Sequence, residues 1–229
     1  MVELTATELA TRLGVSRRHA IDLLASGAIA GRKLSSGAWL AHSDSVLQYE
    51  TAAQRGSGGR MSAATAWGLL WELSDMDATW LSPSTLRRVR GRLRAQSAED
   101  IARAVSGRTR LHRYRAANAA KANLDLIATG RAAASVLKVG LMDDARQVSG
   151  YLPQGVDAAT YASTHFMVAD PAGRDVLYMN TVPIPTDGGV MPVAVIAADL
   201  AVSSNARERS GGLRALDQLR RQWLTCPAE

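Results

Sequence analysis

Cysteine is almost absent from this chain, and Cys226 is the only one among its 229 residues. A single cysteine excludes a disulfide framework and a cysteine-based zinc site within one chain. The sequence does not open on a basic segment followed by an apolar one, which argues against a secretory signal. We therefore expect a protein of the reducing cytoplasm.

Long apolar runs are missing too. The longest, at residues 192–202, has about half the length that a membrane-spanning helix needs, and it contains Asp199. Hydrophobic residues make up 47% of the chain and charged residues 21%, which is typical of a soluble globular protein. The length predicts two or three domains, and no contact with a membrane is expected.

Lysine is scarce, because only three of the 27 basic residues are lysines: Lys33, Lys121 and Lys138. Arginine therefore supplies nearly all of the positive charge, and the formal net charge is +6. Arginine binds phosphate and guanine through two parallel hydrogen bonds, so its dominance suits a nucleic-acid-binding protein. The alternative explanation is a GC-rich genome, whose codon bias enriches arginine and alanine in any protein.

The common catalytic patterns are also absent. The four histidines form no H-x-x-x-H or H-x-E pattern, and there is no P-loop, G-x-S-x-G or G-x-G-x-x-G. Among the aspartates only Asp199 follows an apolar run that would hold it rigidly, and a helix cap is its simplest role. We expect no catalytic residue, no metal site and no cofactor. A metal-dependent DNA-processing enzyme, which needs several converging carboxylates, is the weaker alternative.

Two short amphipathic helices are predicted within residues 4–27. The first starts at a capping box, in which the side chains of Thr5 and Glu8 satisfy free backbone amides, and it ends at Gly14. Ser16 is expected to cap the second helix. The exposed first turn of that helix carries Arg17, Arg18 and His19.

A β-hairpin is predicted at residues 29–41, directly after the second helix. Two short runs with apolar residues flank the turn sequence SSG at residues 35–37. Arg32 and Lys33 lie on the first arm. A hairpin in this position is a wing, whose basic residues would meet the phosphate backbone. Ser43 is then expected to cap a short third helix that closes the small core.

Residues 4–50 resemble the excisionase or MerR-like winged helix-turn-helix. The match rests on LGVSRR at residues 13–18 and on SG at residues 26–27, which ends the second helix in that pattern. Ile21 and Asp22 depart from it, because such domains often have an aromatic and a basic residue there. Asp22 would face inward, pair with an arginine one turn earlier, or accept a hydrogen bond from cytosine. The resemblance implies DNA contacts for Ser16, Arg17, Arg18, His19, Arg32 and Lys33.

Residues 55–60 (RGSGGR) are typical of a linker that separates a DNA-binding domain at residues 1–54 from a basic helical region at residues 61–115. Within that region, Ser82 followed by Pro83 indicates a helix start, and Ser97 is expected to cap a further helix through Val105. The arginines here suggest a second nucleic-acid contact or a surface for an acidic partner. A solvated helix face is an equal alternative. The expected second patch consists of Arg87, Arg88, Arg90, Arg94 and Arg110.

Residues 116–229 predict an α+β domain with a small antiparallel sheet. An alanine-rich helix is expected at residues 131–138 and a long amphipathic helix at residues 207–224. The turn sequence DPAG at residues 170–173 lies between two of the strands. Strands are expected at residues 148–152, 165–169, 176–182 and 190–195.

Residues 105–224 also resemble the C-terminal domain of AbiEi-type antitoxins, the DNA-binding partners of nucleotidyltransferase toxins. The matching motifs, LIATGRAAA, VLYMNTV and AADLAVS, are short. The family implies a repressor that binds repeats in its own promoter and counteracts the toxin encoded beside it.

Together these patterns predict a helix-rich α+β protein with a winged helix-turn-helix, a helical middle region and a C-terminal α+β domain. The expected function is sequence-specific repression of transcription by the antitoxin of a self-regulating toxin–antitoxin operon. The expected partners are double-stranded DNA, a cognate nucleotidyltransferase toxin and a second copy of the chain on DNA. An excisionase-like, phage or plasmid regulator without a toxin is the alternative.

Overall fold

A computed structural model of the protein describes residues 3–25, 29–42, 45–46, 61–186 and 189–225. The chain divides into two compact units, residues 1–59 and 60–229. Helices and small sheets occur in both, so the prediction of an α+β protein is confirmed. Four features expected from the sequence lie outside the described residues: the SG pair at 26–27, the cap at Ser43, the linker at 55–60 and Cys226.

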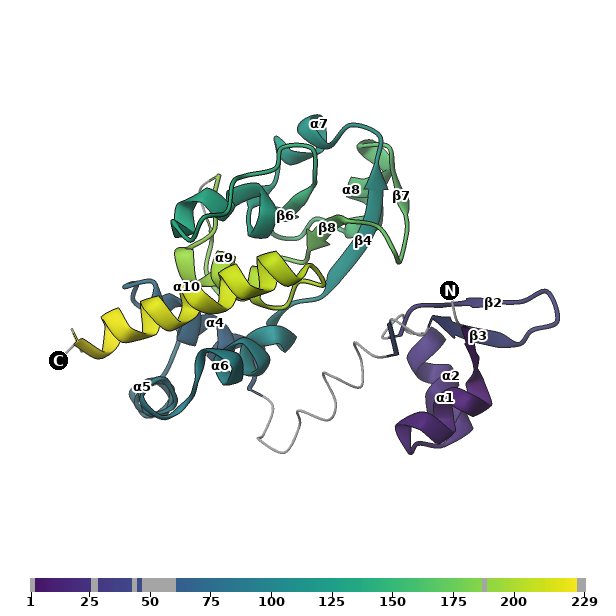
Figure 1. The fold of residues 1–229 in the computed structure, drawn as a ribbon, viewed down its shortest axis with the longest axis horizontal. Coiled ribbons are helices and arrows are strands. Elements are labelled where there is room, and N and C mark those ends of the chain that lie inside the picture. Colours follow the sequence, from purple (N-terminus) through teal and green to yellow (C-terminus); the bar gives the residue numbers. More distant parts are fainter. Residues whose placement is uncertain (1–2, 26–28, 43–44, 47–60, 187–188, 226–229) are drawn as a thin grey trace. The chain divides into compact units, whose positions relative to one another are not determined.

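The first unit packs two helices against a three-stranded antiparallel sheet (Figure 1). The predicted capping box is present: the Glu8 amide donates to Thr5 Oγ1 at 3.3 Å, and the Thr5 amide donates to Glu8 Oε2 at 2.7 Å. Gly14 ends the first helix with a φ of 66°, as expected of a left-handed cap. The elements are β1 (Glu3–Thr5), α1 (Ala6–Leu13), α2 (Arg17–Ala25), β2 (Gly31–Lys33) and β3 (Trp39–His42).

The sheet of the first unit contains the predicted hairpin and one strand that the sequence pattern did not indicate. β2 and β3 pair antiparallel, and the Leu34 amide donates to the Ala38 carbonyl at 2.7 Å across the turn. β1 pairs with the other edge of β3, which places Leu4 opposite Ala41. Thr5 is therefore both the last residue of β1 and the cap of α1.

The second unit begins with three helices, continues with strands and short helices, and ends with the long helix α10 (Figure 1). The predicted helix starts at Ser82 and Ser97 are confirmed, since each side chain accepts a hydrogen bond from the backbone amide three residues later. The elements are α4 (Ala63–Leu73), α5 (Pro83–Ala95), α6 (Ala98–Val105), the 3₁₀ turn η1 (Ser106–Arg108), β4 (Leu111–Ala116), α7 (Ala119–Asn123), β5 (Ile127–Ala128), the 3₁₀ segment η2 (Gly130–Leu137), β6 (Ser149–Tyr151), α8 (Ala158–Thr164), β7 (Met167–Ala169), β8 (Asp175–Tyr178), α9 (Val193–Ala201) and α10 (Ala206–Thr225).

The five strands of this unit form one sheet in the order β5-β6-β8-β4-β7. β6 and β8 run parallel, so the sheet is mixed, and the prediction of an antiparallel sheet is wrong for this pair. β4 lies between β7 and β8, although both follow it much later in the chain. The DPAG turn forms, with the Gly173 amide donating to the Asp170 carbonyl at 2.8 Å, but it carries the chain across β4. A side chain at Gly173 would place its Cβ 2.1 Å from the Tyr114 carbonyl oxygen.

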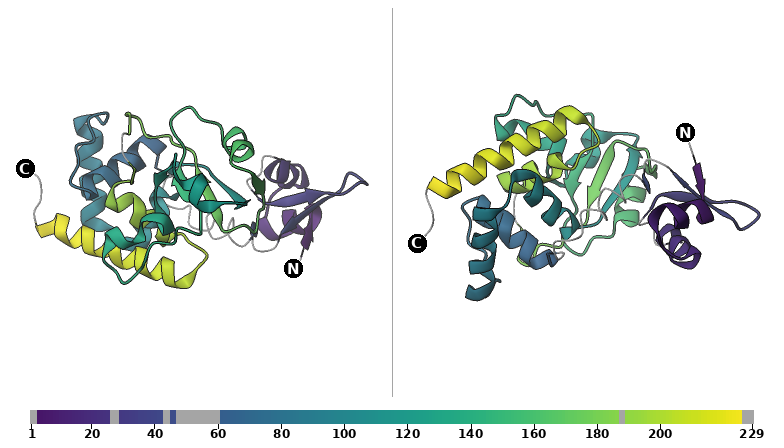
Figure 2. Two further views of the ribbon diagram at one scale, coloured as in Figure 1. Left: turned by 90° about the horizontal axis from the view of Figure 1, so that it is seen from above. Right: turned by 60° about the horizontal axis from the view of Figure 1, so that its bottom comes forward.

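Side chains cover both faces of this sheet. Val176 and Tyr178 belong to the larger core, which α4, α6, α9 and α10 share, while Leu177 between them belongs to a smaller core with α7 and α8. Figure 2 shows the blue and teal helices of residues 63–105 at one end of the unit and the strands at the other. The larger core takes residues from Ala66 to Trp223, so residues 61–115 and 116–225 form one unit with no boundary near residue 115.

Two predicted elements differ from those observed. The strand expected at residues 190–195 is wrong: Val190 forms a single bridge with Ala128, and α9 begins at Val193. An unbroken apolar run suits a fully buried helix as well as a strand, and α9 is buried on nearly every side. The helix expected at residues 131–138 is instead a 3₁₀ segment with a kink at Ala133. No helix in the described parts of the chain is long and apolar enough to cross a bilayer.

Candidate nucleic-acid interface

The first turn of α2 is an exposed basic feature of the first unit. Ser16 caps the helix, as predicted, by accepting a hydrogen bond from the His19 amide at 3.2 Å. Because the buried face of α2 packs on α1, the opposite face of this turn remains open, and Arg17, Arg18 and His19 are all exposed. The buried residues that hold the helix are Ala20, Leu23 and Leu24.

Both arginines of this turn keep their full hydrogen-bonding capacity. Within the described residues, the side chains of Arg17 and Arg18 form no hydrogen bond or ion pair. A free guanidinium offers five N–H donors in a fixed plane. Asp22 lies one turn further along α2 and is exposed, so it does not face inward. Within the described residues it forms no ion pair with Arg18. The turn therefore presents two open guanidinium groups with one carboxylate beside them.

On the hairpin, Arg32 and Lys33 differ in availability. Lys33 is exposed, and its ammonium has no partner among the described residues. Arg32 is also exposed, but Nε and Nη2 each donate to one oxygen of Glu3 at 2.9 Å. The hydrogen bond from Arg32 holds the pKa of Glu3 below its ordinary value, and His42 Nδ1 lies 3.7 Å from the same carboxylate. Sequence reasoning missed Glu3 because it did not predict β1, the strand that brings Glu3 to β2 through β3.

The expected second patch lies in the second unit, and several of its arginines already have partners within the protein. Arg88 donates to Thr85 Oγ1 at 3.0 Å, and Arg94 stacks over the Trp223 ring at 5.4 Å from its centroid. Arg87 is exposed and has no partner among the described residues.

Arg90 and Arg110 depart further from the expected patch. Arg90 Nε donates to Glu72 Oε1 at 2.8 Å, and the two side chains are only 24% and 8% exposed. Arg110 is exposed but precedes β4 and does not belong to α5. The α5 arginines therefore serve partly to attach the helix to the rest of the unit.

Asp199, the aspartate expected to be held rigidly, is not a helix cap. It lies inside α9, is buried, and forms an ion pair with the buried Arg108. Thr129 Oγ1 donates to Asp199 Oδ2 at 2.7 Å, and the Tyr151 hydroxyl donates to Oδ1 at 3.2 Å. Burial opposes the charge of Arg108, but the attraction of Asp199 outweighs it and raises the pKa of the guanidinium above its ordinary value. The oxygens of Asp199 are thus occupied by protein donors.

Sequence reasoning did not single out Arg108, because its partner is 91 residues away in the chain. In the parts that the structure describes, no three His, Cys, Asp or Glu side chains come together in a way that could hold a metal ion. No family model, curated protein or solved structure matches the chain.

Proposed function

We propose that the first unit is a winged helix-turn-helix that binds double-stranded DNA at specific sequences. The observation that carries this proposal is the pair of exposed guanidinium groups, Arg17 and Arg18, on the first turn of α2, neither of which has a partner in the described residues. In a helix-turn-helix this turn enters the major groove. Arginine there donates two hydrogen bonds to guanine, and His19 lies on the same turn.

Neighbouring groups fit the same mode of binding. Ser16 caps α2, and the backbone amides at this helix start suit a phosphate oxygen. Lys33 on the hairpin would contact the phosphate backbone, and Arg32 would join it after leaving Glu3. The exposed Asp22 would accept a hydrogen bond from the amino group of cytosine.

The chain as a whole, on this proposal, is a transcriptional repressor and the antitoxin of a nucleotidyltransferase toxin, with no catalytic role. The support for the antitoxin part is the resemblance of residues 105–224 to AbiEi-type antitoxins. One small winged domain buries too little surface for tight specific binding, so two copies would bind repeated half-sites. The second unit would then carry the contact with the toxin.

Gel-shift titration with the DNA upstream of the gene tests the DNA-binding proposal. Arg17→Ala with Arg18→Ala should remove specific binding, because each lost base contact costs about 1–3 kcal/mol. The matched control is Arg207→Ala with Arg221→Ala, which removes two exposed arginines of α10 and should leave affinity unchanged. Equal affinity and specificity in the Arg17/Arg18 variant would overturn the assignment of α2 as the recognition helix.

Co-expression with a nucleotidyltransferase encoded next to the gene tests the antitoxin proposal. Wild-type protein should restore growth in cells that produce the toxin. The Arg17/Arg18 variant should also restore growth if the second unit makes the contact, while losing repression of the promoter. Repression without any rescue would identify a regulator that has no toxin.

A further inference from the structure

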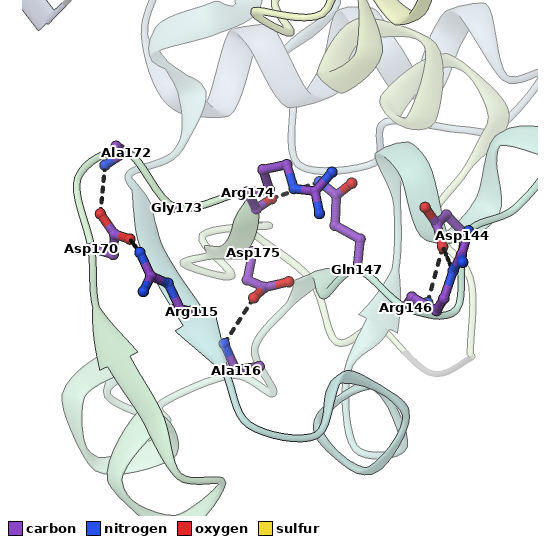
Figure 3. A pocket seen from close by; sticks show the side chains of 10 residues that line it. All are labelled: Arg115, Ala116, Asp144, Arg146, Gln147, Asp170, Ala172, Gly173, Arg174 and Asp175. Carbon is purple, nitrogen blue, oxygen red and sulfur yellow. Dashed lines mark hydrogen bonds and ion pairs between the residues drawn. The ribbon is translucent and has the colours of Figure 1, made fainter.

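A charged cavity of about 610 Å³ lies in the second unit, where β4 ends and where β6 and β8 begin (Figure 3). Three separate segments form its wall: the end of β4, residues 144–147 before β6, and residues 170–175, which lead into β8. Figure 3 shows Arg115 with Asp170 on one side, Arg146 with Asp144 on the opposite side, and Arg174 with Gln147 between them. Each segment thus contributes one arginine.

One carboxylate of the cavity, that of Asp175, has a structural role. Asp175 accepts a hydrogen bond on each oxygen, from the backbone amides of Ala116 and Val148, both at 2.8 Å. It therefore joins the end of β4 to the segment that enters β6. Asp175 therefore helps to fix the wall of the cavity, and both of its oxygens have backbone partners.

The other two carboxylates are also held by local amides. Asp170 Oδ1 accepts from the Ala172 amide at 2.9 Å, and Asp144 Oδ1 accepts from the Arg146 amide at 3.1 Å. These backbone hydrogen bonds lower the pKa of both aspartates, so both remain ionised at neutral pH. Each also faces an arginine, which neutralises part of its charge.

The groups of the cavity that remain available to bind a ligand are mainly N–H donors. Arg174 is exposed, and its guanidinium has no partner among the described residues. The side chains of Arg146 and Arg115 are 94% and 79% exposed, and each pairs with its aspartate through one nitrogen. Gln147 Nε2 donates a hydrogen bond to the Arg174 carbonyl at 2.6 Å, which leaves the side-chain oxygen Oε1 as an acceptor.

The size and lining of the cavity narrow the class of ligand. Its volume lies within the range of small-molecule sites, about 300–1,000 Å³. No aromatic or large aliphatic side chain lines it, so an apolar ligand or a stacked base would gain little there. Guanidinium groups from several directions bind phosphate oxygens well. An acceptor such as the Gln147 oxygen suits a hydroxyl group.

We propose that this cavity binds a phosphorylated sugar, with its phosphate on Arg174 and Arg146 and its hydroxyls on Gln147 and Asp144. The sugar phosphate is free or forms part of a nucleotide, since the two share this chemistry. This site lies within the second unit and is independent of the DNA-binding function proposed for α2.

Calorimetric titration of the full chain tests the proposal, with ribose 5-phosphate, AMP and ribose as probes at fixed salt. Ribose 5-phosphate should bind and ribose should not, while tighter binding of AMP would identify the nucleotide as the preferred form. Arg174→Gln should weaken binding about tenfold, because it removes a charge-assisted contact. Arg87→Gln is the matched control, since Arg87 is also exposed and also lacks a partner in the described residues.

Three results would overturn the proposal. The first is no binding of either phosphorylated probe to wild-type protein that melts cooperatively. The second is equal affinity in wild type and Arg174→Gln. The third is displacement of ribose 5-phosphate by duplex DNA together with weaker DNA binding in Arg174→Gln, which would make the cavity a contact for nucleic-acid phosphate. DNA binding that fails only in the Arg17/Arg18 variant would leave the cavity proposal intact.

Discussion

The Arg32 guanidinium donates two hydrogen bonds to the Glu3 carboxylate, with Nε–Oε1 and Nη2–Oε2 distances of 2.9 Å. A guanidinium that binds a carboxylate at two points cannot bind a phosphate in the same way at the same time. Arg32 therefore has to break its ion pair with Glu3 before it can contact a DNA phosphate.

Glu3→Gln should strengthen DNA binding, because it removes the charge that holds Arg32 and that repels phosphate. The salt dependence of binding should steepen by about one unit of log–log slope if Arg32 gains one phosphate contact. Gel-shift titrations at several salt concentrations measure both effects. Arg32→Gln should weaken binding less in wild type, where Glu3 competes for the guanidinium, than in Glu3→Gln. An unchanged slope in Glu3→Gln would mean that Arg32 does not reach DNA.

Arg90→Gln and Arg87→Gln should behave differently, although both change an arginine of α5. Arg90→Gln leaves the buried Glu72 carboxylate without its ion pair and should lower the free energy of unfolding by about 1–3 kcal/mol. Arg87→Gln should leave stability unchanged, and urea titration compares the two. A DNA salt slope lower by about one unit in Arg87→Gln would identify a phosphate contact on α5. An equal slope would mean that Arg87 belongs to the solvated surface of α5.

Arg108→Met should destabilise the second unit by about 3–5 kcal/mol, because it leaves the Asp199 carboxylate buried without a counter-charge. Asp199→Asn should also destabilise, since the guanidinium then remains buried alone. The double variant should lose less stability than the sum of the two single changes. Urea unfolding of all four proteins, followed by tryptophan fluorescence, gives this coupling. Additive losses would show that the pair does not act as a unit.

Gly173→Ala should lower stability by about 1–3 kcal/mol or more, because its Cβ would lie 2.1 Å from the Tyr114 carbonyl oxygen, which is fixed in the sheet. Gly91→Ala is the matched control. A Cβ at Gly91 meets nothing within 4 Å, and alanine in helix α5 should stabilise by about 0.5–1 kcal/mol. Thermal melting should therefore move in opposite directions for the two variants. A fall in both would mean that α5 does not tolerate the added methyl group.

Alkaline pH should weaken the fold through Tyr161. Burial raises the pKa of this phenol from 10.0 to about 12. The fold therefore favours the neutral form, and its contribution is complete below pH 10 and lost as pH rises through about 12. Tyr161→Phe should lose less stability over this window than wild type does. At neutral pH it should be weaker by about 1 kcal/mol, because the hydroxyl donates to the Ala122 carbonyl at 2.6 Å. Parallel pH curves for the two proteins would contradict the assignment.

The first unit was largely predictable because its signals are short in range. A capping box, a left-handed glycine and a two-armed hairpin each depend on residues only a few positions apart, and all three are present. β1 was missed because a three-residue strand has no periodicity of its own, and its partner β3 lies on the far side of both helices in the chain.

The second unit was less predictable because its decisive contacts join distant residues. The run that contains Asp199 suits a strand or a buried helix equally well, and only the pairing with Arg108 explains why a charge lies within it. The cavity is a further example, since Arg115, Arg146 and Arg174 come from three segments that no single motif connects. Helix starts with a capping serine were again predicted correctly.

The position of α10 at the end of the described chain sets the order in which the two units can fold during synthesis. α10 supplies Leu216 and Trp223 to the same core that α4 begins, so the second unit cannot close until the ribosome has released nearly all of the described chain. The first unit has its own core, and the described residues of that core lie between residues 4 and 46. It is free to fold while the rest is still being translated. A ribosome that stops before α10 would therefore release a nascent chain whose first unit is folded and whose second unit is not.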